Sequence, residues 1–186
     1  MISIPQAPPP EFSKIVDLDS LGDQDMTFAL EADAEARSAL AARFGLVAID
    51  RFSAEVTLRW LVPGKVLWVW GRVSADVAQT CVVTLDPVRA AVDEEFDLRF
   101  ARRPGDAADL MDPEDVEPLE GDSVDIGEIA AEELLLSLDP YPRSPNIDEA
   151  ALNLGPGASL SSDDEPIAES PRKNPFDVLA TFKTKL

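Results

Sequence analysis

The fold of this 186-residue chain is decided by residues 51–60, Arg51-Phe52-Ser53-Ala54-Glu55-Val56-Thr57-Leu58-Arg59-Trp60, in which polar and apolar side chains alternate. A period of two residues is typical of a β-strand with one buried and one exposed face. Residues 90–100 alternate in the same way, and residues 66–73 and 77–85 are two more apolar runs. These runs predict four strands in succession.

Short connections separate the four runs. Val62-Pro63-Gly64-Lys65 carries proline and glycine at the two central positions of a type II turn. Ser74-Ala75-Asp76 separates the middle runs, and Asp86-Pro87 ends the third. Neighbouring strands with short connections pair antiparallel, so the sequence predicts a meander with one dry face.

Two helices are predicted beside these strands. Asp33 can cap a helix that runs through Phe44, with Gly45 as its stop. The residues Asp125 to Glu128 have the sequence of a capping box, and apolar residues at helical spacing follow as far as Leu138. Residues 11–17 and 26–30 are candidate further strands. The predicted fold class is α+β, a mainly antiparallel, curved sheet with flanking helices, in a domain over residues 1–143.

The C-terminal part has a different composition. Residues 144–171 contain six acidic residues and no basic one, with many Pro, Gly and Ser, which predicts an acidic disordered linker. In residues 172–186 the charge becomes positive, and Asn174-Pro175 can start a short basic amphipathic tail helix. Its apolar side chains, spaced three apart, are candidates for partner binding: Phe176, Leu179 and Phe182. The alternative is that the tail folds back to complete the domain core.

The net charge of the chain indicates which class of molecule it binds. The chain has 36 Asp and Glu against 16 Lys and Arg, a formal net charge of −20, and residues 104–139 hold thirteen acidic residues and no basic one. Nucleic-acid-binding proteins usually carry a basic footprint, so this balance favours a basic protein partner. No signal peptide and no apolar stretch of about 20 residues is visible, so we expect a cytoplasmic protein without a membrane contact.

Several kinds of chemistry are excluded by composition. Histidine is absent and Cys81 is the single cysteine, which excludes Ser-His-Asp and Cys-His catalysis, zinc sites of His and Cys, and an intrachain disulfide. In the middle of a predicted strand, Cys81 is expected to be a small buried apolar side chain with nothing to lower its pKa. Nucleotide-binding glycine loops are absent. We therefore expect no enzyme, no cofactor and no metal.

Arginine and tryptophan on the predicted strands form the one candidate binding surface of the domain. Its members are Arg51, Arg59, Trp68, Trp70, Arg72 and Arg99. Bases of single-stranded RNA stack on aromatic rings between basic side chains, so this set could bind RNA directly. The other interpretation places the tryptophans in the core and pairs the arginines with Glu55, Asp93, Glu95 and Asp97 across the strands.

Three motifs together resemble a known family. They are EADAEAR running into LAARFGL over residues 31–46, QTCVVTLDPV over 79–88, and DIGEIAAEELLLSLDPYPR over 125–143. They resemble the YceD-like family of large ribosomal RNA subunit accumulation proteins, in the form typical of alphaproteobacteria. The ending NPFDVLA, residues 174–180, is also similar.

The resemblance implies a non-enzymatic cytoplasmic factor that supports accumulation of large-subunit ribosomal RNA and ribosome assembly. Its partner would be a basic ribosomal protein or a pre-ribosomal component, with direct contact to ribosomal RNA through the arginine and tryptophan face as the alternative. Many relatives carry a second cysteine in the central motif and more after Pro-Tyr-Pro. Here Cys81 stands alone and Ser144-Pro145-Asn146 follows Arg143, so metal binding is not carried over.

Overall fold

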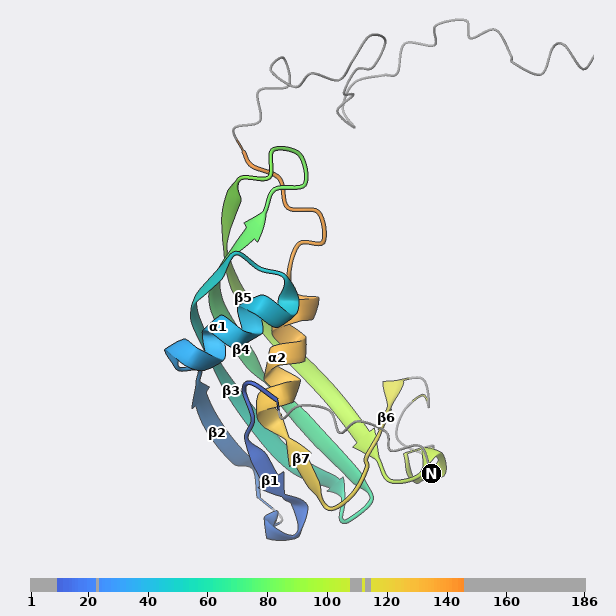
Figure 1. Ribbon diagram of the computed structural model, residues 1–186. Helices are drawn as coiled ribbons and strands as arrows, with labels where there is room; N and C mark the ends of the chain where they lie inside the picture. The colour runs from blue at the N-terminus through green and yellow to red at the C-terminus, as the bar shows by residue number, and fades with distance from the viewer. Residues whose placement is uncertain (1–9, 23, 108–111, 113–114, 146–186) are drawn as a thin grey trace, which may run out of the picture. The chain divides into compact units, whose positions relative to one another are not determined.

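The computed structural model describes residues 10–22, 24–107, 112 and 115–145 (Figure 1). All of them belong to one compact unit, residues 1–147. The predicted tail helix, and all but the first two residues of the predicted linker, lie outside the described residues. The described part has the α+β fold that the sequence predicts.

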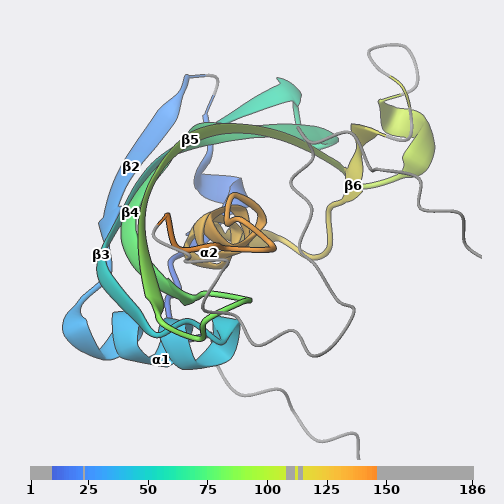
Figure 2. The same cartoon turned by 90° about the horizontal axis from the view of Figure 1, so that it is seen from above.

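A five-stranded sheet makes up most of the fold, and three of its strands are long. Its order is β2 (Met26–Glu31), β3 (Ala48–Val62), β4 (Val66–Thr80), β5 (Pro87–Ala101) and β6 (Glu117–Pro118). The first four pair antiparallel as a meander, while β6 pairs with β5 in parallel. Figure 2 shows this sheet curving around a helix. The prediction of a mainly antiparallel, curved sheet is confirmed.

The predicted break inside β4 is wrong. Ser74 lies between Ser53 of β3 and Asp93 of β5, in unbroken register with both strands. Ala75 is buried in the core while its polar neighbours face outward, so the alternation continues through this point. Small polar residues at outward positions therefore do not interrupt the strand. The run predicted over 77–85 is also too long, since β4 ends at Thr80 and a loop follows.

Local signals determine the turn and the helix ends. Gly64 has φ +67°, and the amide of Lys65 donates to the carbonyl of Val62 over 2.9 Å, as a type II turn requires. Helix α1 (Ala34–Phe44) begins where Asp33 accepts the amide of Ala36. It ends at Gly45, which adopts the left-handed conformation.

Helix α2 (Ile126–Leu136) begins as predicted, but its capping box is half formed. The carboxylate of Asp125 accepts the amides of Gly127 and Glu128 over 3.0 and 3.2 Å. The carboxylate of Glu128 reaches away to Arg43. The helix also ends two residues before the predicted Leu138, at the C-cap Ser137.

The core lies between the inner face of the sheet and α2. Phe52, Val56 and Val69 project inward from the sheet, and Ile126, Ala130 and Leu134 come from the helix; all six side chains are buried in one cluster. This arrangement follows from the period-two pattern of the strands meeting the apolar stripe of an amphipathic helix. Figure 2 shows α2 inside the curve of the sheet.

Two short strands hold the N-terminal segment beside α2. They are β1 (Ile15–Asp17) and β7 (Ser123–Asp125), which pair antiparallel, and the 3₁₀ turn η1 (Leu18–Ser20) follows the first; a second such turn is η2 (Pro104–Asp106). A Cβ atom on Gly127 would lie 2.6 Å from the carbonyl oxygen of Phe12. Glycine therefore allows α2 to pass this close to the N-terminal segment.

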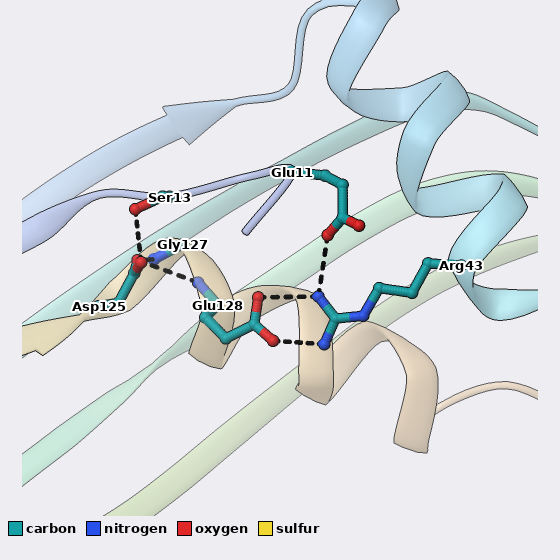
Figure 3. A network of polar contacts seen from close by, with 6 residues as sticks. All are labelled: Glu11, Ser13, Arg43, Asp125, Gly127 and Glu128. Carbon is teal, nitrogen blue, oxygen red and sulfur yellow. Dashed lines mark hydrogen bonds and ion pairs between the residues drawn. The ribbon is translucent and has the colours of Figure 1, made fainter. Parts of the chain in front are cut away.

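A polar network joins the two helices to the N-terminal segment (Figure 3). Arg43, in the last turn of α1, pairs with both carboxylate oxygens of Glu128 in the first turn of α2 and with Glu11 at 3.1 Å. A cation near a helix C-terminus and an anion near an N-terminus each complement the helix dipole. Beside them, Ser13 donates to Asp125, the N-cap of α2. The network therefore ties three segments distant in sequence.

Candidate partner-binding surface

The outer face of the sheet carries the arginines and tryptophans that the sequence singled out. Strand pairing places Arg59, Trp68 and Arg99 side by side on β3, β4 and β5. Thr57, Trp70 and Asp97 form the next row, and Glu55, Arg72 and Glu95 form the row after that. Because these residues alternate with the buried ones, they project away from α2. We call this surface the outer face.

The two tryptophans form an aromatic cluster on this face. The rings of Trp68 and Trp70 stack with centroids 4.0 Å apart at 30°. The guanidinium carbon of Arg59 lies 4.9 Å from the centroid of Trp68 and 5.6 Å from that of Trp70, which is cation–π distance. Both indoles are half-buried and lie outside the core, to which Trp60 contributes from the opposite face. The interpretation of Trp68 and Trp70 as core residues is therefore wrong.

Each arginine of the outer face is paired with a carboxylate. The closest pairs are Arg51–Asp76 at 2.9 Å, Arg59–Asp25 at 3.3 Å, Arg72–Asp93 at 2.7 Å and Arg99–Asp97 at 2.9 Å. The hydrogen bond that Arg51 donates to Asp76 raises the pKa of Arg51. Three predicted acceptors are confirmed: Asp93, Asp97 and Glu95, the last at 3.9 Å from Arg72. Asp25 and Asp76 were missed, because the pairing of strands determines which side chains lie opposite each other. The positive charges of these four arginines are thus neutralised by neighbouring carboxylates.

A shallow hollow of about 480 Å³ opens on the outer face over Gly71. Carboxylates of Glu55, Glu95 and Asp97 line it together with Trp70 and Arg72, whose guanidinium lies 3.9 Å from the carboxylate of Glu95. Asp97 also accepts the indole N–H of Trp68 over 2.9 Å. Carboxylate oxygens beside an indole ring are groups that bind an ammonium or guanidinium ion. The hollow can therefore receive a lysine or arginine side chain.

Cys81 differs from its prediction in two respects, its place in the fold and its pKa. Its side chain is buried, as expected, but it lies in the loop after β4 and not within a strand. The amides of Thr84 and Ser144 both donate to its sulfur over 3.4 Å. Hydrogen bonds from Thr84, more than that from Ser144, lower the pKa of the thiol to about 6 against the opposing effect of burial. The turn of the loop supplies the donors that a strand would not.

The remaining predictions concern the tail residues, a metal site and a membrane-spanning helix. Phe176, Leu179 and Phe182 lie outside the described residues. Within residues 10–22, 24–107, 112 and 115–145, no three side chains of His, Cys, Asp or Glu lie close enough to hold a metal ion together. No helix among the described residues is long and apolar enough to cross a membrane.

Comparison with known proteins identifies the family. The family model described as large ribosomal RNA subunit accumulation protein YceD matches residues 69–183. This chain belongs to the YceD family. The match to YceD begins in β4, so it includes Trp70, Arg72 and Arg99 of the outer face and all of α2. Neither the curated proteins nor the solved structures contain a match. The family's name links this chain to accumulation of large-subunit ribosomal RNA.

Proposed function

We propose that this YceD protein acts in the cytoplasm, without catalysing a reaction, by binding a basic ribosomal protein of the large subunit. Holding such a protein until it meets ribosomal RNA would support accumulation of that RNA. The family match supports the process, and the outer face supports the kind of partner. The acidic linker and the basic tail helix, predicted for residues 144–171 and 172–186, would extend this binding surface, the tail as a docking segment.

One observation carries the choice of partner. The arginines of the outer face already have carboxylate partners, and the hollow beside Trp70 is lined by three carboxylates, those of Glu55, Glu95 and Asp97, against one cation, Arg72. An approaching lysine or arginine meets an excess of carboxylates and an aromatic ring there, while a phosphate meets that same excess of negative charge and a single arginine. The net charge of −20 adds long-range attraction for a cationic protein and repulsion for nucleic acid.

Direct binding of ribosomal RNA by the outer face is the second candidate. The observation that favours it is the stacked pair Trp68 and Trp70 with Arg59 beside them, an arrangement on which a nucleobase can stack. Binding of this kind would require Arg59 to exchange Asp25 for a phosphate. That exchange makes RNA the weaker candidate.

The two candidates are separated by binding assays with matched variants. E55Q/E95Q removes two charges from the hollow, and E35Q/E120Q removes two exposed charges elsewhere. Purified basic proteins of the large subunit should bind E55Q/E95Q about three- to tenfold more weakly than E35Q/E120Q, because only E55Q/E95Q removes charges from the proposed contact. A tenfold difference in affinity corresponds to about 1.4 kcal/mol. Equal affinities would contradict the proposal. Binding of a ribosomal RNA fragment that W68A abolishes would establish the RNA candidate instead.

A further inference from the structure

A second surface lies where α2 ends, away from the outer face. A groove of about 530 Å³ is formed there by the end of α1, the start of the loop at 81–86, the last turn of α2 and residues 138–142. Most of its lining is apolar, and it includes Val82, Leu135 and Leu136. Leu136 is 77% exposed, and Leu85, in the same loop as Val82, is 75% exposed. Scattered exposed apolar residues are ordinary, but gathered ones mark contact sites.

Hydrogen bonds between its walls hold the groove in shape. The amide of Val82 donates to the carbonyl of Pro142 over 2.9 Å, and the side chain of Gln79 donates to the carbonyl of Asp139 over 2.8 Å. The Ser144 amide bound to Cys81 adds a third link between the same two segments. A surface preorganised in this way loses little conformational entropy when a ligand binds.

Leu85, in the loop that contributes Val82 to the groove, has an unusual backbone conformation. Its φ is +64°, and no other non-glycine residue among the described residues has a positive φ. A side chain with a Cβ atom is disfavoured in this conformation, where glycine or asparagine is usual. Most of the leucine side chain is nevertheless in solvent, so burial within the domain does not offset the cost. Contact with another molecule would.

Charge around the groove indicates which molecule fits. Helix α2 has no basic residue in its last turn, so its C-terminal carbonyl groups keep their partial negative charge. Asp139 lines the groove at this end, and Asp86 follows Leu85 in the loop. A largely apolar groove whose lining contains one carboxylate, that of Asp139, and no lysine or arginine is complementary to a segment that has apolar side chains on one side and lysine or arginine on the other.

We propose that this groove receives an amphipathic basic segment of a partner protein, with its apolar side chains on Leu85, Val82 and Leu136 and its cations near Asp139. The inference deepens the proposed function, on which it rests for the nature of the partner. It adds a second contact surface to the outer face. The probe for this site is a synthetic helical peptide of leucine and lysine, with a scrambled peptide of the same composition as its control.

The test uses the full chain at physiological salt. L85N/L136Q removes the exposed apolar groups and puts asparagine where φ is positive, so the domain should fold at least as well. I15Q alters another exposed apolar residue, Ile15 on β1, which is 67% exposed, as the matched control. We expect L85N/L136Q to weaken binding of the amphipathic peptide at least fivefold, I15Q to leave it unchanged, and the scrambled peptide to bind weakly. Fluorescence anisotropy of the labelled peptides measures all three.

Four outcomes would overturn the inference. Equal binding of both peptides would show attraction by charge alone, and equal affinity of the two variants would show that the groove is not used. A dimer of the unmodified chain that L85N/L136Q dissociates would make a second copy the occupant. Peptide binding that appears only after deletion of residues 172–186 would make that segment the occupant.

The outcomes also separate this inference from the proposed function. Basic ribosomal proteins that bind through Glu55 and Glu95, with no effect of L85N/L136Q on the peptide, would overturn the groove and keep the proposed function. Groove-dependent binding of the peptide, with no binding of any basic ribosomal protein, would keep the groove and overturn the proposed function.

Discussion

Replacing Arg43 should reveal how strongly the polar network couples the two helices. Arg43 binds both carboxylate oxygens of Glu128 and also contacts Glu11 (Figure 3). The hydrogen bonding of Arg43 to the carboxylate of Glu128 is the largest cause of the raised pKa of Arg43. The pKa of Glu11 is lowered first by a backbone hydrogen bond and then by the hydrogen bond from Arg43. The network is therefore electrostatically coupled as well as close in space.

The expected magnitude follows from geometry and exposure. The side chains of Arg43 and Glu128 are 36% and 23% exposed, against 53% and 60% for the surface pair Arg72–Asp93. Exposed pairs contribute about 0.2–1 kcal/mol to the free energy of unfolding. The pair of Arg43 and Glu128 is bidentate and partly buried, and it lies at the C-terminus of one helix and the N-terminus of the other. Its coupling energy should therefore exceed that range, and we expect about 1–2 kcal/mol.

A double-mutant cycle measures this coupling. The variants are R43M, E128Q and the double variant, with R72M, D93N and their double variant as the control cycle. Urea unfolding followed by tryptophan fluorescence gives each free energy. Raising NaCl to about 0.5 M should screen the exposed control pair more than the network, because partly buried charges are less accessible to salt. A network coupling no larger than that of the control pair would refute the reasoning.

Three further predictions concern other parts of the chain. G71A should lower the free energy of unfolding by about 2–3 kcal/mol, because a Cβ atom on Gly71 would lie 2.0 Å from the carbonyl oxygen of Glu55. The control G22A should not lower it, because a Cβ atom on Gly22 would meet no atom within 4 Å; equal urea midpoints of the two variants would contradict this prediction. Between about pH 6 and 8.5 the unfolded chain binds a proton at Cys81 that the folded chain does not, so the free energy of unfolding should rise with pH in this window. In urea titrations C81A should flatten that rise, and an unchanged slope of the unfolding free energy against pH would exclude the thiolate. Deleting residues 172–186 should weaken partner binding and leave the thermal midpoint nearly unchanged, whereas a large fall in that midpoint with intact binding would show that the segment belongs to the core.

Sequence pattern predicted those features that depend on neighbours along the chain. The alternation over 51–60 places Phe52, Val56 and Leu58 on the buried face of β3, as the structure has them. Asp33 and Gly45 mark the ends of α1 because caps act on amides and carbonyls within a few residues. The acidic balance, read with the family motifs, already favoured a basic partner before any fold was known.

Other features were decided by tertiary structure alone. Strand register determined that Trp68 and Trp70 face outward with Arg59, and that Asp25 and Asp76 pair with arginines. The sequence around these residues does not indicate which residues of a neighbouring strand lie opposite them. A period of two identifies the two faces of a strand but cannot say, for a run apolar on both, which face meets the core.

The same limit applies to contacts between distant segments. The loop that follows β4 brings the amide of Thr84 to the Cys81 sulfur, and residues 139–144 meet this loop only because α2 ends beside it. Arg43 and Glu128 are separated by 85 positions. Secondary structure follows from backbone periodicity and local capping, which act within a few residues. The groove, the outer face and the polar network depend on packing between elements, which only the folded chain brings together.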